Sequence, residues 1–341
     1  MNHHFLQSEI WEKYEKTERH TVFRLTNSNY NCLVVKTHTQ LGDYFYLPYG
    51  PDLKIGSKAP NFSKTGQTTI QPTSTAQKSL EKALTALRTH AKDAHAYFIR
   101  IEPTVAFTPA QMAQIAQKTH FKLKKSKEIN PAHTWIVDLS LSEAEILSNI
   151  EKPKVRRWRN HVKKGLSIRT TKDPEEIKTL THFLQQVGEK NNFIPQSKQH
   201  LKNQLKSGFA TLYIADYQNP AEPKSTPKPI AAALVYDWQG VRYSVHAASD
   251  PAPEFKNLAA PSILIVQIIL DAKKLGAHTY DLWGITTSQN PNHPWYGFTQ
   301  YKKTFGGRQI DYTGTYDFVL RPVKYRLYQI LRRINRALRK K

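Results

Sequence analysis

The sequence contains a single cysteine, comparatively few acidic residues and no long apolar run. Cys32 cannot form a disulfide within the chain, so nothing points to an oxidising compartment, and the apolar run Cys32–Val35 suggests that it is a core residue. The longest apolar stretch, Ala259–Leu270, is interrupted by Pro261 and Gln267, and the N-terminus has no apolar signal core. We therefore expect a cytoplasmic protein that is neither secreted nor membrane-spanning.

Metal-ligand spacing is also missing. The 14 histidines are scattered along the chain, and the nearest approach to a pair, His90 and His95, would not share a helix face. We expect neither a metal site nor a cofactor.

The shortage of acid leaves a strong positive charge. Lys and Arg number 50 against 27 Asp and Glu, which gives a formal charge of +23. A field of this sign attracts phosphates, so a polyanionic partner is the physical interpretation, and a basic bias of the whole proteome is the alternative. The length of 341 residues exceeds what a single core usually supports, which predicts two domains.

The order of predicted elements indicates two successive mixed α/β units. In the first, short β-rich runs precede a helix near Thr75–His90. The strand Thr134–Leu139 then leads to Ser142 and Glu145, whose spacing is that of a capping box at a helix start. The same order of elements recurs afterwards. We predict an α/β (α+β) protein with one domain over residues 1–141 and a second over residues 142–310.

A run of basic residues follows the capping box. Residues 152–165 contain seven Lys and Arg and no acid, with Trp158 among them. One interpretation is a solvated helix face with cations favourably placed at its C-terminal end. Contact with RNA or a nucleotide is the better hypothesis, because phosphates would neutralise the cations and Trp158 could stack on a base.

A second constellation lies near the C-terminus. Its three parts are Asp281-Leu282-Trp283-Gly284-Ile285, His293-Pro294-Trp295-Tyr296-Gly297-Phe298 and Tyr301-Lys302-Lys303-Thr304-Phe305-Gly306-Gly307. This run resembles the FemABX family of peptidoglycan bridge-forming aminoacyltransferases. Three earlier segments match the family in the same order, namely Phe5–Lys13, Tyr46–Pro51 and Ile99–Pro103.

The resemblance implies a pair of GNAT-like acyltransferase domains without the coiled-coil arm of some members, and a C-terminal segment, residues 311–341, that returns to the first domain. It implies transfer of an amino acid from aminoacyl-tRNA to the stem peptide of a peptidoglycan precursor, either lipid II or UDP-MurNAc-pentapeptide. We expect the protein to act as a monomer.

The resemblance also suggests site residues. Lys302 matches the family's lysine and would stabilise the oxyanion, with Tyr301 packed beside it; a surface lysine is the alternative. Lys13 matches the lysine that contacts the precursor phosphates. Three ligand-contacting positions of the family, an Arg and two Tyr, are here occupied by Gln196, His200 and His246, and Trp295 and His293 would shape the acceptor pocket. The proposed tRNA contacts are Lys154, Arg156, Arg157, Arg159, Lys163 and Lys164.

Two rival functions remain open. An acyl-coenzyme A transferase on the same fold would need a glycine-rich loop before a helix to hold the pyrophosphate, and residues 257–262 contain no glycine. A non-catalytic RNA-binding protein would satisfy the charge but has no use for the Lys302 motif.

The last 21 residues contain nine basic residues and no acid. An apolar stripe at helical spacing accompanies them, formed by Leu327, Leu331, Ile334 and Leu338. The stripe either lies on an anionic membrane surface or docks on the first domain while the cations contact tRNA. We favour the membrane, since a lipid-linked acceptor would be found there.

Overall fold

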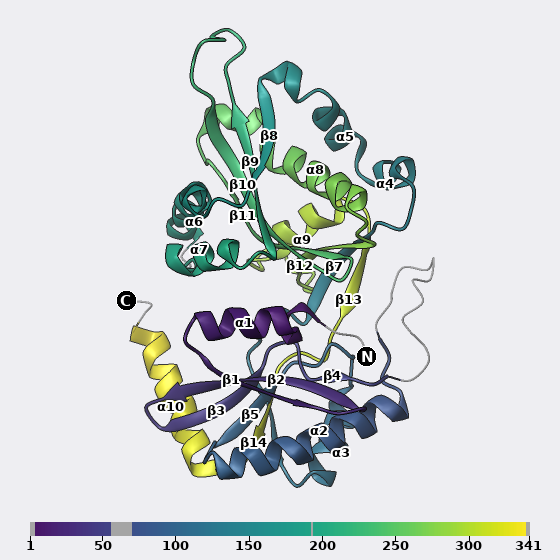
Figure 1. The fold of residues 1–341 in the computed structure, drawn as a ribbon, viewed down its shortest axis with the longest axis vertical. Coiled ribbons are helices and arrows are strands. Elements are labelled where there is room, and N and C mark those ends of the chain that lie inside the picture. Colours follow the sequence, from purple (N-terminus) through teal and green to yellow (C-terminus); the bar gives the residue numbers. More distant parts are fainter. Residues whose placement is uncertain (1–3, 56–69, 192–193, 339–341) are drawn as a thin grey trace. The chain divides into compact units, whose positions relative to one another are not determined.

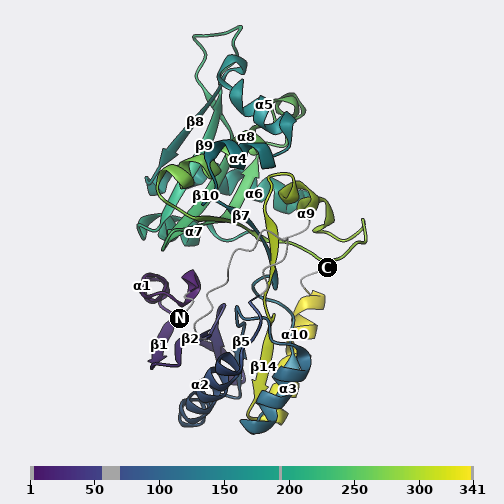
Figure 2. The ribbon, with the colours of Figure 1, turned by 90° about the vertical axis from the view of Figure 1, so that its right-hand side faces the viewer.

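The computed structural model describes residues 4–55, 70–191 and 194–338 (Figures 1 and 2). The chain forms two compact units, residues 1–132 with 310–341, and residues 133–309. Our predicted boundary after residue 141 differs from this division, because strand β7 (His133–Asp138) pairs with β12 (Thr279–Gly284) in the sheet of the second unit.

The first unit is built on a seven-stranded sheet in the order β1-β2-β3-β5-β14-β6, with β4 paired to β2. Its strands are β1 (Thr21–Thr26), β2 (Tyr30–Thr39), β3 (Gly42–Leu47), β4 (Asp52–Leu53), β5 (Phe98–Ile101), β6 (Lys122–Lys125) and β14 (Tyr316–Val319). β14, from the end of the chain, lies between β5 and β6 and pairs antiparallel with both. The C-terminal segment thus completes the sheet of the first unit.

Helices cover both faces of this sheet. The core on one face includes residues of α2 (Ser74–Asp93) and α3 (Pro109–Lys118), with Phe45 and Ile99 from the strands. The neighbouring residues Tyr44 and Phe98 point to the opposite face, since side chains alternate along a strand, and pack against α10 (Pro322–Leu338).

A buried ion pair holds the start of α10 to the sheet. The Arg100 guanidinium donates to both carboxylate oxygens of Asp317, at 2.7 and 2.8 Å. The Tyr325 hydroxyl of α10 donates to the same carboxylate at 2.8 Å. The rings of Tyr44 and Phe98 lie 5.4 and 5.1 Å from the guanidinium carbon. Because such a pair is expensive to break by removing one partner, it fixes the first turn of α10.

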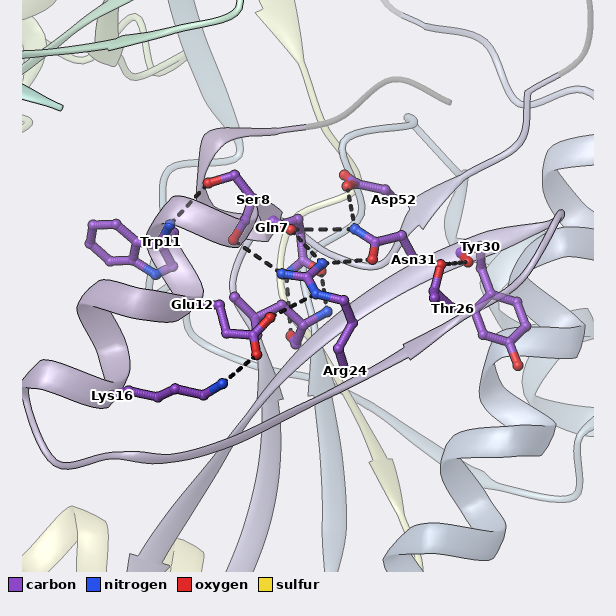
Figure 3. Close-up of polar contacts among 11 residues, drawn as sticks. Gln7, Ser8, Trp11, Glu12, Lys16, Arg24, Thr26, Tyr30, Asn31 and Asp52 are labelled. Carbon is purple, nitrogen blue, oxygen red and sulfur yellow. Dashed lines mark hydrogen bonds and ion pairs between the residues drawn. The ribbon is translucent and has the colours of Figure 1, made fainter.

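The N-terminal motif has a structural role in the first unit (Figure 3). Gln7, at the end of a 3-10 turn (Phe5–Gln7), accepts the Leu33 amide at 2.8 Å and donates to the Pro48 carbonyl at 2.8 Å. Arg24 donates to the Gln7 carbonyl and to Glu12 of α1 (Glu9–Thr17), both at 2.8 Å. These bonds fasten α1 to the sheet.

The other two N-terminal motif segments meet nearby. The Glu102 amide donates to the Gly50 carbonyl at 2.9 Å, and the Glu102 carboxylate accepts from the hydroxyls of Tyr46 and Thr315, both at 2.7 Å. The early motifs therefore connect β3, β5 and the segment before β14.

The second unit has a seven-stranded sheet in the order β13-β7-β12-β11-β10-β9-β8. Its remaining strands are β8 (Leu166–Thr171), β9 (Ala210–Tyr217), β10 (Lys228–Trp238), β11 (Val241–Ser249) and β13 (Arg308–Asp311). α4 (Glu143–Asn149), α5 (Lys152–Arg159) and α8 (Ala260–Lys274) share one core with this sheet. α6 (Ile177–Asn191) and α7 (Lys198–Lys206) pack on β9, β10 and β11, and neither projects as an arm. The capping box of Ser142 and Glu145 is confirmed at the start of α4.

Within the described ranges, none of the helices combines the length and the apolar character needed to cross a bilayer.

We predict that Gly50→Ala lowers the free energy of unfolding of the first unit by about 1–3 kcal/mol, because a Cβ there would lie 2.4 Å from the Gln7 side-chain amide. The amide cannot move aside without losing its bonds to Leu33 and Pro48. Urea unfolding followed by circular dichroism measures the loss. In a Gln7→Ala background the same substitution should cost much less, and an equal cost in both backgrounds would contradict this explanation.

Candidate functional site

The candidate site centres on Lys302, near the C-terminal end of α9 (Tyr296–Lys303). Its side chain is buried, with 5% of the residue exposed. The ammonium donates to the Gly284 carbonyl at 2.6 Å and lies 3.9 Å from the centre of the Phe298 ring. Burial lowers the pKa of Lys302 from 10.5 to about 7, and the charge of Asp281 opposes that shift. Lys302 is therefore a buried lysine whose protonation state changes near neutral pH.

Asp281 of β12 supplies the negative charge beside this cation. Burial raises the pKa of its carboxyl from 3.8 to about 6, against the opposing effects of its hydrogen bonds and of Lys302. The carboxylate accepts from the Thr134 hydroxyl of β7 and from the Trp283 amide, the latter at 2.7 Å. Two titratable groups of opposite charge thus share one buried location, which is typical of a functional site.

A bulge in β12 shapes this location. The register between β12 and β7 shifts between Asp281 and Gly284, and Trp283 has φ 66°, a conformation that L-residues rarely adopt. The bulge lets Asp281 bond the amide two residues ahead, while the Gly284 carbonyl accepts from Lys302. Strained backbone of this kind persists where its surroundings hold it, commonly at functional sites.

The strands diverge at the same place. β11 and β12 are parallel neighbours, and their ladder comprises Val241–Tyr243 and Thr279–Asp281. Both strands continue past it, so Lys302 and Asp281 lie where the carboxyl ends of two parallel strands separate. Ligands of open α/β sheets bind at such positions.

The two consecutive glycines of the motif allow the chain to return to the sheet after α9. Gly306 and Gly307 have φ of 72° and 93°, and a Cβ on Gly307 would lie 2.1 Å from the Ile136 carbonyl oxygen of β7. The Trp135 indole donates to the Gly306 carbonyl at 2.6 Å. These close approaches fix the turn that ends α9, and with it the position of Lys302.

The Tyr301 side chain contacts the start of α8 and Phe305. Its hydroxyl lies 3.1 Å from that of Ser262 at the start of α8, and its ring packs edge-on against Phe305 at 5.2 Å. Burial raises the pKa of Tyr301 to about 12, so the phenol stays protonated. Its contacts are those of a residue that positions α9.

The basic run divides into two groups. Arg156, Arg157, Arg159, Lys163 and Lys164 are exposed on α5 and in the segment that follows it.

Lys154 differs from these five. Its ammonium pairs with Glu151 at 3.0 Å and lies 5.5 Å from the ring centres of both Tyr301 and Phe305. Trp158 donates to Gln267 of α8 at 2.9 Å and packs on the core. The indole N–H therefore holds α5 to α8, and base stacking by Trp158 stays a prediction.

A groove accompanies the exposed cations. It has a volume of about 790 Å³, lies between α4 and α5, and includes Lys152, Arg156 and Arg159 in its lining. Within residues 144–160, every charged side chain that lines it is basic.

The residues expected to bind the precursor are spread over both units. Lys13 is exposed on α1 of the first unit. In the second, Gln196 is exposed just before α7, and His200 and His246 lie close enough that His200 contributes to lowering the pKa of His246 to about 4, although burial is the larger cause. Trp295 is partly exposed at the residue before α9.

Three members of the site were not assigned a role from the sequence. Asp281 and Gly284 belong to the motif, but the sequence alone did not show that the fold places them next to the Lys302 side chain. Thr134 carries no sequence signal, since it contributes through β7, which precedes Asp281 by 147 residues.

The start of α8 does not offer a phosphate cradle. Pro261 has no amide hydrogen, and the Ser262 amide donates to the Ala259 carbonyl at 3.0 Å. A pyrophosphate loop needs free backbone amides at this helix start, so the geometry disfavours acyl-coenzyme A.

Comparison with known proteins gives matches that include the Lys302 motif. Residues 198–333 match the model of the FemAB family, a range that contains the whole Lys302 motif. A lipid II:glycine glycyltransferase of Staphylococcus aureus strain MSSA476 is 21% identical, over 77% of this chain and 78% of that protein.

Among solved structures, FemX superposes with a TM-score of 0.76 and 17% identity, covering 96% of this chain and 94% of FemX. L-PGS of Bacillus licheniformis superposes with a TM-score of 0.52 and 10% identity, covering 96% of each chain. The predicted fold class, two α/β domains without a coiled-coil arm in the described part of the chain, is confirmed.

We predict that Lys302→Met stabilises the second unit at pH 6.5 and that this gain shrinks as the pH rises from 7 towards 10. Since the folded pKa of Lys302 lies below its value in the unfolded chain, the unfolded state binds more protons over this interval, and native stability rises with pH. The methionine variant lacks this rise. Urea unfolding followed by tryptophan fluorescence measures the difference, because five of the six tryptophans belong to the second unit. Lys303→Met, which changes the adjacent lysine, is the control; a stability difference for Lys302→Met that does not change with pH would contradict the assignment.

Proposed function

Because this chain is a member of the FemABX family, we propose that it transfers an amino acid from aminoacyl-tRNA to the stem peptide of a peptidoglycan precursor. The observation that carries the proposal is the buried Lys302 ammonium at the point where β11 and β12 separate. The acceptor is lipid II or UDP-MurNAc-pentapeptide, and the product is the beginning of an interpeptide bridge.

The chemistry is acyl exchange. The stem-peptide amine attacks the ester carbonyl, a C–N bond forms, and negative charge develops on the carbonyl oxygen. Collapse of this tetrahedral intermediate breaks the C–O bond to the tRNA ribose, whose oxygen takes up the proton that the amine releases. The ester is already activated, so the protein has to position two anionic substrates, exclude water and stabilise the oxyanion.

Lys302 suits the last of these tasks. Its position is fixed by the Gly284 carbonyl and the Phe298 ring, and a cation in a dry environment acts more strongly on a developing oxyanion than one in water. Asp281 favours the charged form of Lys302. Tyr301, bonded to Ser262 and packed on Phe305, has the supporting task of positioning α9.

The donor tRNA would contact α5. Five exposed cations, Arg156, Arg157, Arg159, Lys163 and Lys164, give this face the charge that a phosphate backbone requires. Lys154 takes part indirectly, because its ammonium lies over the Tyr301 ring and so connects α5 to α9.

Precursor recognition is assigned to Lys13, Gln196, His200, His246, Trp295 and His293. The replacement of an Arg and two Tyr by Gln196, His200 and His246 leaves this set with fewer fixed cations than the family pattern implies. With the pKa of His246 lowered to about 4, its imidazole is neutral at physiological pH and would act through hydrogen bonds.

A decisive test of the function is incubation with a mixture of charged tRNAs and both precursor forms, followed by mass spectrometry of the stem peptide. An added aminoacyl mass that disappears after ribonuclease treatment supports the proposal and identifies the amino acid. Retention of tRNA without any added mass favours an RNA-binding protein instead.

We predict that Lys302→Met lowers turnover by about 10²–10³-fold, the loss expected for one oxyanion donor, while precursor binding stays close to that of the native protein. Single-turnover transfer measures the first quantity and calorimetry the second. Lys303→Met changes the adjacent lysine and should retain native turnover. Near-native turnover of Lys302→Met would remove Lys302 from the mechanism.

We also predict that the combined changes Arg156→Glu, Arg157→Glu and Arg159→Glu weaken tRNA binding and flatten its salt dependence. If each arginine neutralises one phosphate, the slope of log K against log salt falls by about 2 to 3. Filter binding at several salt concentrations measures the slope. The matched control replaces Lys78, Lys82 and Lys92 of α2 with Glu, which changes the net charge of the protein by the same amount. Equal effects of both triple variants would show that overall charge, rather than α5, attracts the tRNA.

A further inference from the structure

The C-terminal helix α10 carries an apolar stripe on its outer side. Val323, Leu327, Ile330 and Ile334 are 72%, 46%, 51% and 48% exposed. Their spacing of four, three and four residues places them on one face of the helix. Exposed aliphatic side chains are ordinary when they are single, but a contiguous set marks an interaction surface.

This stripe differs in part from the predicted one. Leu327 and Ile334 are exposed as members of it, whereas Leu331 is half-buried. The side chain of Leu338 lies outside the described residues. Val323 and Ile330 complete the exposed row instead.

The opposite face of α10 is already occupied. Tyr325 is buried on the Arg100–Asp317 pair, and the Tyr328 ring packs on Tyr44, Tyr97 and Phe98. The helix is therefore docked through its tyrosines, and the predicted alternative, in which the apolar stripe docks on the first domain, is wrong. The stripe points away from the core that holds the helix.

A basic groove runs along one side of the stripe. It has a volume of about 550 Å³ between β6 and α10, and its lining includes Ile330 of the stripe itself. The cations that line it are Lys122, Lys124, Lys125, Lys127, Arg326, Arg332 and Arg333. Over the described residues of the groove, no carboxylate lines it. Such a set of like charges is stabilised by an anionic partner.

We propose that α10 and β6 form a surface that binds an anionic lipid bilayer. The aliphatic stripe would enter the boundary between headgroups and acyl chains, while the groove cations contact lipid phosphates, so that apolar burial and charge attraction add. RNA matches the charges but not the stripe, because single-stranded RNA is held by aromatic stacking and duplex RNA by shape. The combination of the two features selects the bilayer.

This surface stands independently of the proposed transfer reaction, since its residues lie apart in sequence from the Lys302 motif and from the basic run on α5. Membrane binding is therefore measured on the full chain with neither tRNA nor precursor present. If transfer activity is never detected, the membrane proposal is unaffected, and the reverse also holds.

The experiment is co-sedimentation with vesicles of phosphatidylglycerol and phosphatidylcholine in equal amounts, and with vesicles of phosphatidylcholine alone. We expect the native chain to bind the anionic vesicles preferentially and to be released by salt. The double change Leu327→Gln and Ile330→Gln should lower the partition coefficient about tenfold or more. The triple change Lys124→Gln, Arg326→Gln and Arg333→Gln should lower it about fivefold for each cation removed.

Matched controls separate the surface from general effects. Ile129→Gln with Leu275→Gln alters two other exposed aliphatic residues, and Lys78→Gln with Lys82→Gln and Lys92→Gln removes three charges from α2. Both should bind vesicles as the native chain does. Absence of native binding to anionic vesicles, or native-like binding by the stripe variant, would overturn the proposal. A groove variant that keeps vesicle binding and loses tRNA binding would assign the cations to RNA.

Discussion

A lysine ammonium held inside the second unit is the feature around which the proposed chemistry is arranged. Removing such a charge from water is costly, and the lowered pKa of Lys302 expresses that cost. The Gly284 carbonyl, the Phe298 ring and Asp281 each recover part of it. Those partners are in place because β12 bulges at Trp283 and because Gly306 and Gly307 let the chain return beside β7. Several motif residues are thus explained by one buried charge.

The large positive charge of the chain is used in three distinct ways. Arg100 is paired inside the first unit, where its bonds to Asp317 attach α10. Lys302 is buried beside Asp281, whose negative charge favours the ammonium form of the lysine. The cations of α5 and of the groove beside α10 are exposed, and their role is attraction over a distance. Net charge alone does not distinguish these uses; the environment of each cation does.

Local patterns were predicted well from the sequence, whereas contacts between distant segments were not. The capping box at Ser142 and the buried Cys32 follow from short-range rules. β6 was missed because its lysine-rich sequence has no apolar alternation and its strand partner, β14, comes from the far end of the chain. The packing role of Trp158 was missed for a related reason, since Gln267, its hydrogen-bond partner, is 109 residues away. The motif identified Lys302, but its carboxyl neighbour emerged only from the fold.

The position of β14 in the sheet also determines the order in which the two units can finish folding during synthesis. Arg100 and Asp317 are 217 residues apart, so at about 5–20 residues per second a ribosome needs roughly 10–40 s to supply the partner of β5. During that interval the second unit, which is continuous in sequence, can be completed while β5 presents an open edge. The unit that leaves the ribosome first is therefore the last to close, and a nascent chain that stops before Val319 exposes an apolar strand edge to its neighbours on the polysome.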